Sequence, residues 1–384
     1  MPEPRMIPRL LFNSDHEEFR QSLRRFLQAE VLPRHAAWEE QGFVDRDVWQ
    51  RAGELGFLCT NMPENYGGSG VDRKFSTIVL EELASSNASG IGWPLHSDIV
   101  APYLLRYGSE ELKQAWLPKM AAGTAITAIA MTEPGTGSDL QAIQTTAIED
   151  GDDYIVNGSK IFITNGYNSD MVVVAVKVGD KSRGAKNVSL LVIEAGRPGF
   201  SKGKPLKKIG MKAQDTCELF FDNVRVPKSN IIGQVGAGFT MLMQELAWER
   251  LLIAITSVAN AEAMLTATIE YTRDRQAFGR AVSSFQNTRF KLAEMKTELQ
   301  IARVFVDRCV ELEVAGELRV DAAAAAKYWC SDLQGKVLDQ CLQLHGGYGF
   351  MQEYPVARAY IDARAQRIYG GTNEIMKEII SRSI

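Results

Sequence analysis

The chain has 384 residues, enough for two or three domains with a sizeable buried core. Hydrophobic residues make up 45% of it and charged residues 23%, as in ordinary soluble globular proteins, and the net charge of -4 gives no sign of nucleic-acid binding. Continuous apolar runs such as MVVVAV are far shorter than the ~20 residues of a membrane-spanning helix. We therefore expect neither a nucleic-acid partner nor a transmembrane segment, and a cytoplasmic location is the default prediction.

Cysteine and histidine usage excludes the common disulfide and metal motifs. The five cysteines form no CxxC pair, which suits a reducing compartment, and the four histidines form no HExxH motif. The N terminus carries early acidic residues and no long apolar core, so it resembles neither a signal peptide nor a transit peptide. No metal site is predicted.

From Asp15 to about Met120 the apolar spacing is mostly helical. The segment DHEEFRQSLRRFLQAEVL places Phe19, Leu23 and Phe26 on one helix face behind Asp15, a candidate N-cap. The turn-rich stretch PENYGGSG and the region of Pro94 divide this zone into several helices. We assign residues 1–124 to an N-terminal all-α domain.

Between about residues 125 and 236 the pattern changes to β-rich runs. The segment DDYIVNGSKIFITNG is predicted to be a hairpin whose strands flank an Asn157-Gly158 turn, and MVVVAVKV, VSLLVIEAG and CELFFDNVRVP follow. Because no helical pattern alternates with these runs, a Rossmann sheet is disfavoured. We predict an antiparallel β-barrel or sandwich domain over residues 125–236.

The last part of the chain is helical again. Helical patterns cover residues 239–274, 284–314 and 320–344, and long helices joined by short turns predict a four-helix-bundle-like domain over residues 237–384. The whole chain is thus an α+β protein, with its domains in the order helical, β, helical.

The loop AMTEPGTGSDL, residues 130–140, is a candidate ligand-binding segment. Its glycines, with Thr132, Thr136 and Ser138, can present N–H groups and hydroxyls to an anionic or polar ligand. A turn-rich linker has the same composition, so that alternative stays open. The loop is no dinucleotide fingerprint, because Leu140 stands where the third glycine belongs.

Three other segments carry weaker signals. In NGSKIFITNG, a strand over residues 160–164 would put Phe162 and Thr164 on one face, suited to a flat heterocycle or simply to a hairpin with a buried ring. The arginines of RDRQAFGR suit a phosphate or a solvated helix end. The glycines of QLHGGYGF admit a ligand or merely end a helix, and we interpret His345 as structural.

Taken together and in order, these motifs resemble the acyl-CoA dehydrogenase family from about Asp15 to the C terminus. The segments that carry the resemblance are MTEPGTGSD, GSKIFITNG, AQDTCELFFDNVRVP, WERLLIA, DRQAFGRAVSSFQNTRFKLAEM, QLHGGYGFMQEYPVARAYIDAR and RIYGGTNEIMKEII. The chain looks closest to the long-chain acyl-CoA dehydrogenases, with isovaleryl-CoA dehydrogenase more distant. One departure is Thr136, where the family usually has alanine.

The resemblance implies a homotetrameric FAD flavoenzyme that converts an acyl-CoA thioester to the trans-2-enoyl-CoA and passes electrons to an electron-transfer flavoprotein. It also implies roles for individual positions. Flavin or substrate contacts would come from Met131, Thr132, Ser138, Phe162 and Thr164. The FAD of a neighbouring subunit would be reached by Arg275, Phe278 and Gln286. The adenosine side would be contacted by Gln343, Gly346 and Gly347, and the pyrophosphate and adenosine end would lie near Thr372 and Glu374. Arg250 would support the acyl-CoA site, and Gly371 would let the chain pass close to substrate.

The base that takes the α-proton is the open question. Most of the family has a glutamate directly after the tyrosine of RIYGGTNEIM, where this chain has Gly370. Either activity is lost, or the base lies elsewhere, as in the long-chain and isovaleryl branches. The residue that matches the glutamate of those branches is Glu249 of WERLLIA, with Glu245 and Glu374 as rivals. Gly370 keeps a backbone N–H that can point at the thioester oxygen.

Two enzymatic alternatives stay open, an acyl-CoA oxidase and a dehydrogenase that acts on a carrier-protein thioester. A non-catalytic acyl-CoA-binding subunit is disfavoured, because Arg275, Gln286, Gln343 and Thr372 are all present. The substrate is predicted to be a medium-chain, long-chain or branched acyl group. Gly90 and Gly92 would leave room for such a chain, or they mark a helix start before Pro94.

Overall fold

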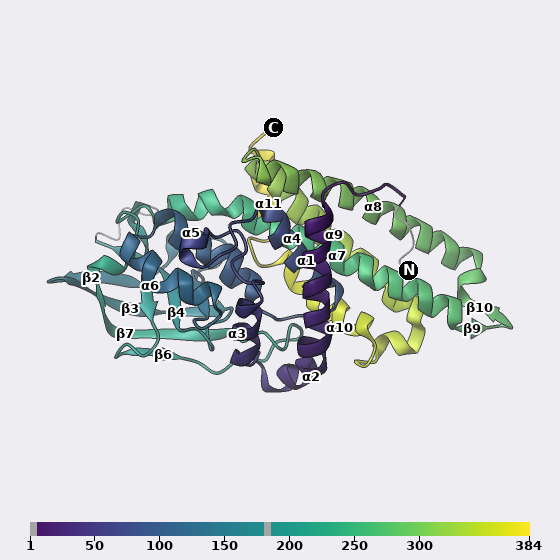
Figure 1. Ribbon diagram of the computed structural model, residues 1–384, viewed down its shortest axis with the longest axis horizontal. Coiled ribbons are helices and arrows are strands. Elements are labelled where there is room, and N and C mark those ends of the chain that lie inside the picture. The colour runs from purple at the N-terminus through teal and green to yellow at the C-terminus, as the bar shows by residue number, and fades with distance from the viewer. Residues whose placement is uncertain (1–5, 180–185) are drawn as a thin grey trace.

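The computed structural model describes residues 6–179 and 186–384. A β-sheet occupies one end of the molecule, helices fill the other end, and the long helix α7 runs from the sheet to the far tip (Figure 1). The predicted order of a helical part, a β part and a second helical part is confirmed.

The N-terminal part is built from six helices and two π-helical segments. They are α1 (Ser14–Phe26), η1 (Leu27–Val31), α2 (Leu32–Gln41), α3 (Arg46–Glu54), α4 (Arg73–Ser85), η3 (Leu95–Val100), α5 (Ala101–Tyr107) and α6 (Glu110–Ala121). The N-cap of α1 is Asn13 rather than Asp15, because the Asn13 side chain accepts a hydrogen bond from the backbone N–H of His16. Asp15 instead lies in the first turn, where its charge suits the helix dipole.

The central part is one eight-stranded sheet in the order β6-β7-β3-β2-β4-β5-β8, with β1 paired to β4. Its strands are β1 (Thr127–Ala130), β2 (Thr146–Asp150), β3 (Asp153–Ile163), β4 (Met171–Val178), β5 (Val188–Glu194), β6 (Phe200–Lys202), β7 (Cys217–Pro227) and β8 (Ile231–Ile232). The β domain is confirmed, but its pairing is mixed, since β1 and β2 both run parallel to β4.

The predicted Asn157-Gly158 turn is wrong. Both residues lie inside the continuous strand β3, where a register shift between Val156 and Gly158 marks an irregularity opposite β7. Gly158 is required there because a Cβ at this position would lie 2.5 Å from the hydroxyl oxygen of Thr145. The turn that joins β2 and β3 is Gly151-Asp152, one strand earlier.

The C-terminal part contains α7 (Gly238–Asp274), α8 (Gln286–Val314), α9 (Val320–His345), α10 (Pro355–Asp362) and α11 (Asn373–Ser381). A two-stranded hairpin of β9 (Gln276–Ala277) and β10 (Arg280–Ala281) joins α7 to α8. The helical patterns predicted for residues 239–274, 284–314 and 320–344 are therefore confirmed almost to the residue.

Helix α7 is also long and apolar enough to cross a membrane, by length and composition alone. Its most apolar window has a mean hydropathy of 1.5, and 67% of that window is buried inside the protein. The sequence expectation considered only uninterrupted apolar runs and so overlooked this helix. A buried core helix gives the same pattern, so we interpret α7 as the core of the fold.

One hydrophobic cluster joins the three parts. It combines Met62 and Leu117 of the N-terminal part, Val173 and Leu190 of the sheet, and Leu242 of α7. Because the parts share this core, the domain limits 1–124, 125–236 and 237–384 stay a prediction.

Candidate active site

Glu249 lies on α7 in a nearly dry environment. Its side chain is buried, and the hydroxyl of Tyr103 on α5 donates a hydrogen bond to its Oε1 over 2.8 Å. Loss of hydration raises the pKa of the Glu249 carboxyl to about 7, even though the Tyr103 hydrogen bond acts in the opposite direction. A carboxyl group with such a pKa can exchange a proton near neutral pH.

Glu245, the nearest rival, lies one helical turn earlier and is held in a different way. Its Oε1 accepts hydrogen bonds from the Arg106 guanidinium over 3.0 Å and from the Tyr107 hydroxyl over 2.8 Å. The positive charge of Arg106 compensates the buried carboxylate of Glu245. We therefore interpret Glu245 as a structural residue rather than as a base.

Gly370 packs directly on α7, one turn beyond Glu249. A Cβ built on Gly370 would lie 2.5 Å from Cδ1 of Ile253, and Ile253 follows Glu249 by four residues on the same helix face. Gly370 also has a φ of 67°, which disfavours any larger residue. Gly370, the position at which most of the family would have its base, therefore contacts the stretch of α7 that carries Glu249.

The segment after Gly370 is tied down by a buried lysine. Lys327 of α9 donates from Nζ to the carbonyl of Gly371 over 2.7 Å and to Oδ1 of Asn373 over 2.8 Å. Thr372 is the N-cap of α11, where its side chain accepts from the N–H of Ile375. Glu374 is exposed in the first turn of α11, and hydrogen bonding to its own N–H lowers the pKa of its carboxyl.

Arg250 differs from the other buried cations around Glu249. It is 4% exposed, and its Nε has no hydrogen-bond partner among the described residues. Burial lowers the pKa of its guanidinium, and the neighbouring Glu249 charge opposes that shift. A desolvated, uncommitted guanidinium is suited to bind an anionic or carbonyl oxygen.

The loop predicted to bind ligand is joined to β3 by backbone and side-chain bonds. The carbonyl of Thr132 accepts from the N–H of Ile161, and the carbonyl of Met131 accepts from Nζ of Lys160. These bonds bring Met131 and Thr132 next to Phe162. Thr136, the departure from the family, is buried and donates its hydroxyl to the carbonyl of Ala142, so it is accommodated within the loop.

A buried ion pair underlies this loop. Nζ of Lys160 lies 2.8 Å from Oε1 of Glu133, and Glu133 also accepts from the backbone N–H groups of Gln144 and Thr145. The carboxylate, near the start of the loop, thus holds the backbone at the end of the loop, while Gly135, Gly137 and Ser138 stay at the surface.

Phe162 is presented to solvent in an unusual conformation. Its φ is 61° and 64% of its surface is exposed, whereas Ile163 beside it is buried. A positive φ in a bulky residue is strained and often marks a functional site. Thr164 follows directly after the end of β3 and is half-buried.

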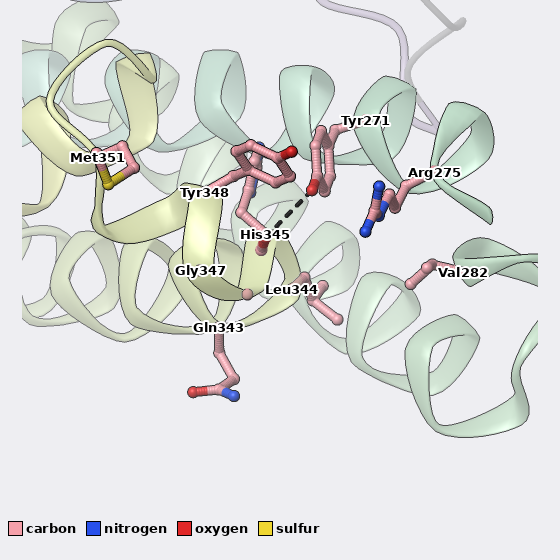
Figure 2. Close-up of a pocket in the computed structure, with 10 residues that line it drawn as sticks. Tyr271, Arg275, Val282, Gln343, Leu344, His345, Gly347, Tyr348 and Met351 are labelled. Carbon is pink, nitrogen blue, oxygen red and sulfur yellow. Dashed lines mark hydrogen bonds between the residues drawn. The ribbon is translucent and has the colours of Figure 1, made fainter. Parts of the chain in front are cut away.

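A second group of predicted residues lines a cavity of about 600 Å³ between the ends of α7 and α9 (Figure 2). Its lining includes Arg275, Gln343, Gly346 and Gly347, together with Tyr348 of the same QLHGGYGF segment and with Tyr271, which lies outside the quoted motifs. The Tyr271 and His345 rings are stacked with centroids 4.2 Å apart, and the Tyr271 hydroxyl donates to the His345 carbonyl. His345 is thus structural, as expected.

This cavity lies near the far end of α7 from Glu249. Phe278 and Gln286 are nearby and exposed, in the β9–β10 hairpin and at the start of α8. The structure therefore brings Glu249, Gly370 and Arg250 into one group and places Arg275, Phe278, Gln286 and Gln343 in another. Within one chain, the two groups of residues therefore do not form a single site.

Gly90 and Gly92 do not open space for a long acyl chain. A Cβ on Gly90 would lie 2.5 Å from the backbone nitrogen of Gln214, and one on Gly92 would lie 1.7 Å from Oδ1 of Asn165. Both glycines are needed because other segments pack tightly on them. The sequence argument from these two glycines to chain length is therefore wrong.

The sequence reasoning missed Tyr103, Lys327 and the Glu133–Lys160 pair. Tyr103 lies in the apolar stretch PYLLRY, and only its four-residue spacing to Tyr107, which matches that of Glu245 and Glu249, could have indicated a role. The buried lysines carried no sequence signal, because an isolated lysine is usually a surface residue.

Among the described residues, no group of three or more histidine, cysteine, aspartate or glutamate side chains is placed to hold a metal ion.

Three family profiles match successive parts of the chain. They are the N-terminal domain of acyl-CoA dehydrogenase over residues 13–124, the middle domain over 128–224 and the C-terminal domain over 236–384. The long-chain specific acyl-CoA dehydrogenase of Sus scrofa is 52% identical over 98% of this chain and 88% of that protein. The isovaleryl-CoA dehydrogenase of Oryza sativa is more distant, at 35% identity over 98% of this chain and 92% of that protein.

A solved acyl-CoA dehydrogenase from Geobacillus kaustophilus has the same fold. It superposes with a TM-score of 0.95 at 48% identity and covers 97% of this chain and 98% of that one. The profiles, the identities and the fold agree along almost the whole length, and they confirm the resemblance to the long-chain branch. This chain therefore belongs to the acyl-CoA dehydrogenase family of flavin-dependent oxidoreductases.

Proposed function

We propose that this enzyme uses FAD to remove the α- and β-hydrogens of an acyl-CoA thioester and that Glu249 is the base for the α-proton. The observation that carries this proposal is the buried carboxyl of Glu249, with its pKa near neutrality, on the helix face that Gly370 contacts one turn away. At the position where most of the family has its base, this chain has Gly370, and α7 supplies a carboxyl group at Glu249 instead.

The residues present are compatible with FAD. Phe162 offers an exposed ring, and around Gly135, Gly137, Gly346 and Gly347 no atom lies within 4 Å of a built Cβ, so a ligand can approach the backbone closely. A glutaryl-CoA dehydrogenase of Mycobacterium smegmatis, with a TM-score of 0.91 and 27% identity, was solved in complex with FADH2. The flavin side would be held by Met131, Thr132, Ser138, Phe162 and Thr164, and the FAD of a neighbouring subunit would be reached by Arg275, Phe278 and Gln286. The adenosine side would be contacted by Gln343, Gly346 and Gly347, and the pyrophosphate and adenosine end by Thr372 and Glu374.

When bound, FAD supplies the acceptor for the β-hydrogen, which leaves as a hydride. The chain's own residues perform the other half of the reaction. Glu249 takes the α-proton, and the negative charge that develops on the thioester oxygen would be stabilised by the Gly370 N–H and by the uncommitted Arg250. The dry surroundings strengthen these interactions and keep the Glu249 pKa high enough for proton transfer.

The substrate we propose is a long-chain acyl-CoA, as the name of the Sus scrofa relative states for that protein. We also propose a homotetramer, in which the two groups of site residues come from different subunits. An electron-transfer flavoprotein is the proposed electron acceptor. In support, a solved chain at 36% identity belongs to a structure named for the electron transferring flavoprotein of Acidaminococcus fermentans.

The test replaces Glu249 by Gln in the flavin-loaded enzyme. Without oxygen, a long-chain acyl-CoA should bleach the wild-type flavin, and Glu249→Gln should lower the bleaching rate by about 10²- to 10⁴-fold. Glu245→Gln and Glu374→Gln should retain much of the rate, because Glu245 is ion-paired and Glu374 is exposed. Bleaching by Glu249→Gln at the wild-type rate would show that another group is the base.

The same preparation separates the remaining alternatives. Oxygen consumption during turnover would indicate an oxidase, and turnover of an acyl carrier-protein thioester in preference to acyl-CoA would indicate the carrier-protein alternative. One solved relative, the prolyl acyl carrier protein oxidase AnaB, combines both properties in its name and shares 30% identity with a TM-score of 0.91. A colourless purified protein would contain no flavin and would support the alternative of a non-catalytic acyl-CoA-binding subunit.

A further inference from the structure

Two tyrosines of α5 and two glutamates of α7 form a ladder with two rungs. Tyr103 donates to Glu249 over 2.8 Å, and Tyr107 donates to Glu245 over 2.8 Å. Both pairs are spaced four residues apart, so each helix advances one turn between rungs, and the helices run antiparallel. Because the two spacings match, the packing of α5 against α7 sets both hydrogen bonds together.

The two rungs differ in how their charge is balanced. The Glu245 rung includes the Arg106 guanidinium, so its carboxylate has a cation within 3.0 Å. In the described part of the chain no cation forms an ion pair with Glu249, and its hydrogen-bond donor is the neutral, fully buried hydroxyl of Tyr103. Among the described residues no donor reaches the other oxygen of Glu249, Oε2.

Other titratable groups face Glu249 from several elements. Its own helix contributes Glu245, whose charge raises its pKa, and Arg250, whose charge lowers it. The second rung adds Arg106 and Tyr107 of α5, which bind Glu245. Four more charged groups act on Glu245, Arg250 or their neighbours rather than on Glu249 directly: Arg73 of α4, Asp98 of η3, Glu313 of α8 and Lys327 of α9. Tyr103 is the group that contacts the carboxyl directly.

We infer that Tyr103 is a positioning residue for Glu249: its hydroxyl holds Oε1 and leaves Oε2 as the oxygen that takes the α-proton. This inference rests on the proposed role of Glu249. A hydrogen bond from a neutral donor stabilises the carboxylate more than the acid, so Tyr103 also keeps the base ionised in a site whose dryness favours the protonated form.

The experiment isolates proton abstraction from flavin reduction. The flavin-loaded enzyme is incubated in D₂O with an acyl-CoA whose α-carbon carries hydrogens and whose β-carbon carries none, and mass spectrometry follows deuterium uptake at the α-carbon. Because no hydride can leave this probe, the pH dependence of exchange reports the ionisation of the base alone. The variants are Tyr103→Phe and Tyr66→Phe, a matched control that loses a tyrosine hydroxyl bonded to Glu110.

In Tyr103→Phe, we expect the acidic limb of the exchange profile to move up by about one pH unit, because a lost hydrogen bond to a charged group is worth roughly that much. Tyr66→Phe should leave the limb unchanged. Replacing Tyr103 by 3-fluorotyrosine, which keeps the ring and is a stronger donor, should move the limb down. These opposite shifts cannot come from altered packing, and the fluorinated protein supplies the answer if Tyr103→Phe does not fold.

An unchanged limb in both Tyr103 variants would overturn the inference and leave Tyr103 as a packing residue. The Glu249→Gln variant, run in the same assay, distinguishes this from failure of the proposed function. If Glu249→Gln abolishes exchange while the Tyr103 variants behave as wild type, only the positioning role is wrong. If Glu249→Gln still exchanges the α-proton, the base itself is wrongly assigned.

Discussion

At the scale of single residues, Glu249 shows a conflict between stability and function. Its carboxyl has a pKa of about 7 in the folded protein, raised from 4.5 by burial. Between these values the folded state binds a proton that the unfolded state has released, so the free energy of unfolding falls as pH rises through this window. Above pH 7 the buried Glu249 carboxyl is ionised. The proposed reaction requires this charge, but the charge lowers the stability of the fold.

We therefore predict that Glu249→Gln stabilises the flavin-loaded enzyme at pH 8 by about 2 kcal/mol, and that the gain disappears near pH 5. Gln keeps the shape and can still accept from Tyr103. Thermal unfolding at both pH values measures the effect. Asp321→Asn is the control outside the site, because the hydrogen bond from Arg319 lowers the pKa of Asp321 to about 2, so its stabilisation is present at both pH values and the substitution should give no gain at either. A Glu249→Gln protein less stable than wild type at pH 8 would contradict the prediction.

Single residues also mark the limit of sequence reasoning about the site. Glu249 could be predicted because the chain resembles the long-chain branch of its family, whose glutamate it matches, and the structure adds that Gly370 contacts the same helix. Tyr103 could not be found in this way, since the hydrogen bond joins residues 146 positions apart and its donor looks like a core aromatic in the sequence. The cavity-lining Tyr271 was missed for the same reason.

At the scale of elements, the loop between β1 and β2 depends on an ion pair beneath it. Lys160 is fully buried, and its partner Glu133 holds two backbone N–H groups of the returning chain. Removing the cation from such a pair leaves a buried carboxylate without a counter-charge.

Lys160→Met should therefore lower the free energy of unfolding by about 3–5 kcal/mol and loosen the loop that includes Met131 and Thr132. Denaturant unfolding measures the first effect, and the ratio of flavin to protein after purification measures the second. Lys228→Met, which breaks an exposed ion pair with Glu149, is the matched control and should change little. Wild-type stability and flavin content in Lys160→Met would show that the pair is dispensable.

The long helices could be predicted from the sequence, whereas the irregular strand and the parallel strand pairing could not. The long helices were found within one or two residues, because apolar periodicity persists over many turns in each. The Asn157-Gly158 signal failed because an Asn-Gly pair suits an irregular strand as well as a turn. The parallel pairing of β1 and β2 with β4 depends on contacts distant in sequence, which local patterns do not encode.

At the scale of the whole molecule, the two groups of site residues lie toward opposite ends of α7, and the far group exposes apolar surface. Phe278, at the tip of the β9–β10 hairpin, is 96% exposed and has a φ of 51°. Within its own chain the ring of Phe278 meets the Phe285 ring edge-on, with centroids 6.2 Å apart, and this contact leaves almost all of its apolar surface in water. Its position beside Arg275 and the cavity of Figure 2 instead favours a partner subunit whose cofactor and surface would cover the ring.

Phe278→Ser is therefore expected to leave the fold of the single chain intact while it weakens both flavin binding and assembly. Covering one phenylalanine is worth about 1.5–3 kcal/mol, which corresponds to roughly 10- to 100-fold weaker flavin affinity. Flavin titration of the apoprotein and light scattering at decreasing protein concentration measure the two effects. Phe220→Ser, an exposed phenylalanine on β7, is the control for loss of an aromatic ring at the surface. If Phe278→Ser binds flavin and assembles like wild type while Phe220→Ser does too, the hairpin does not contact a neighbouring subunit's cofactor, and each chain must complete its site in another way.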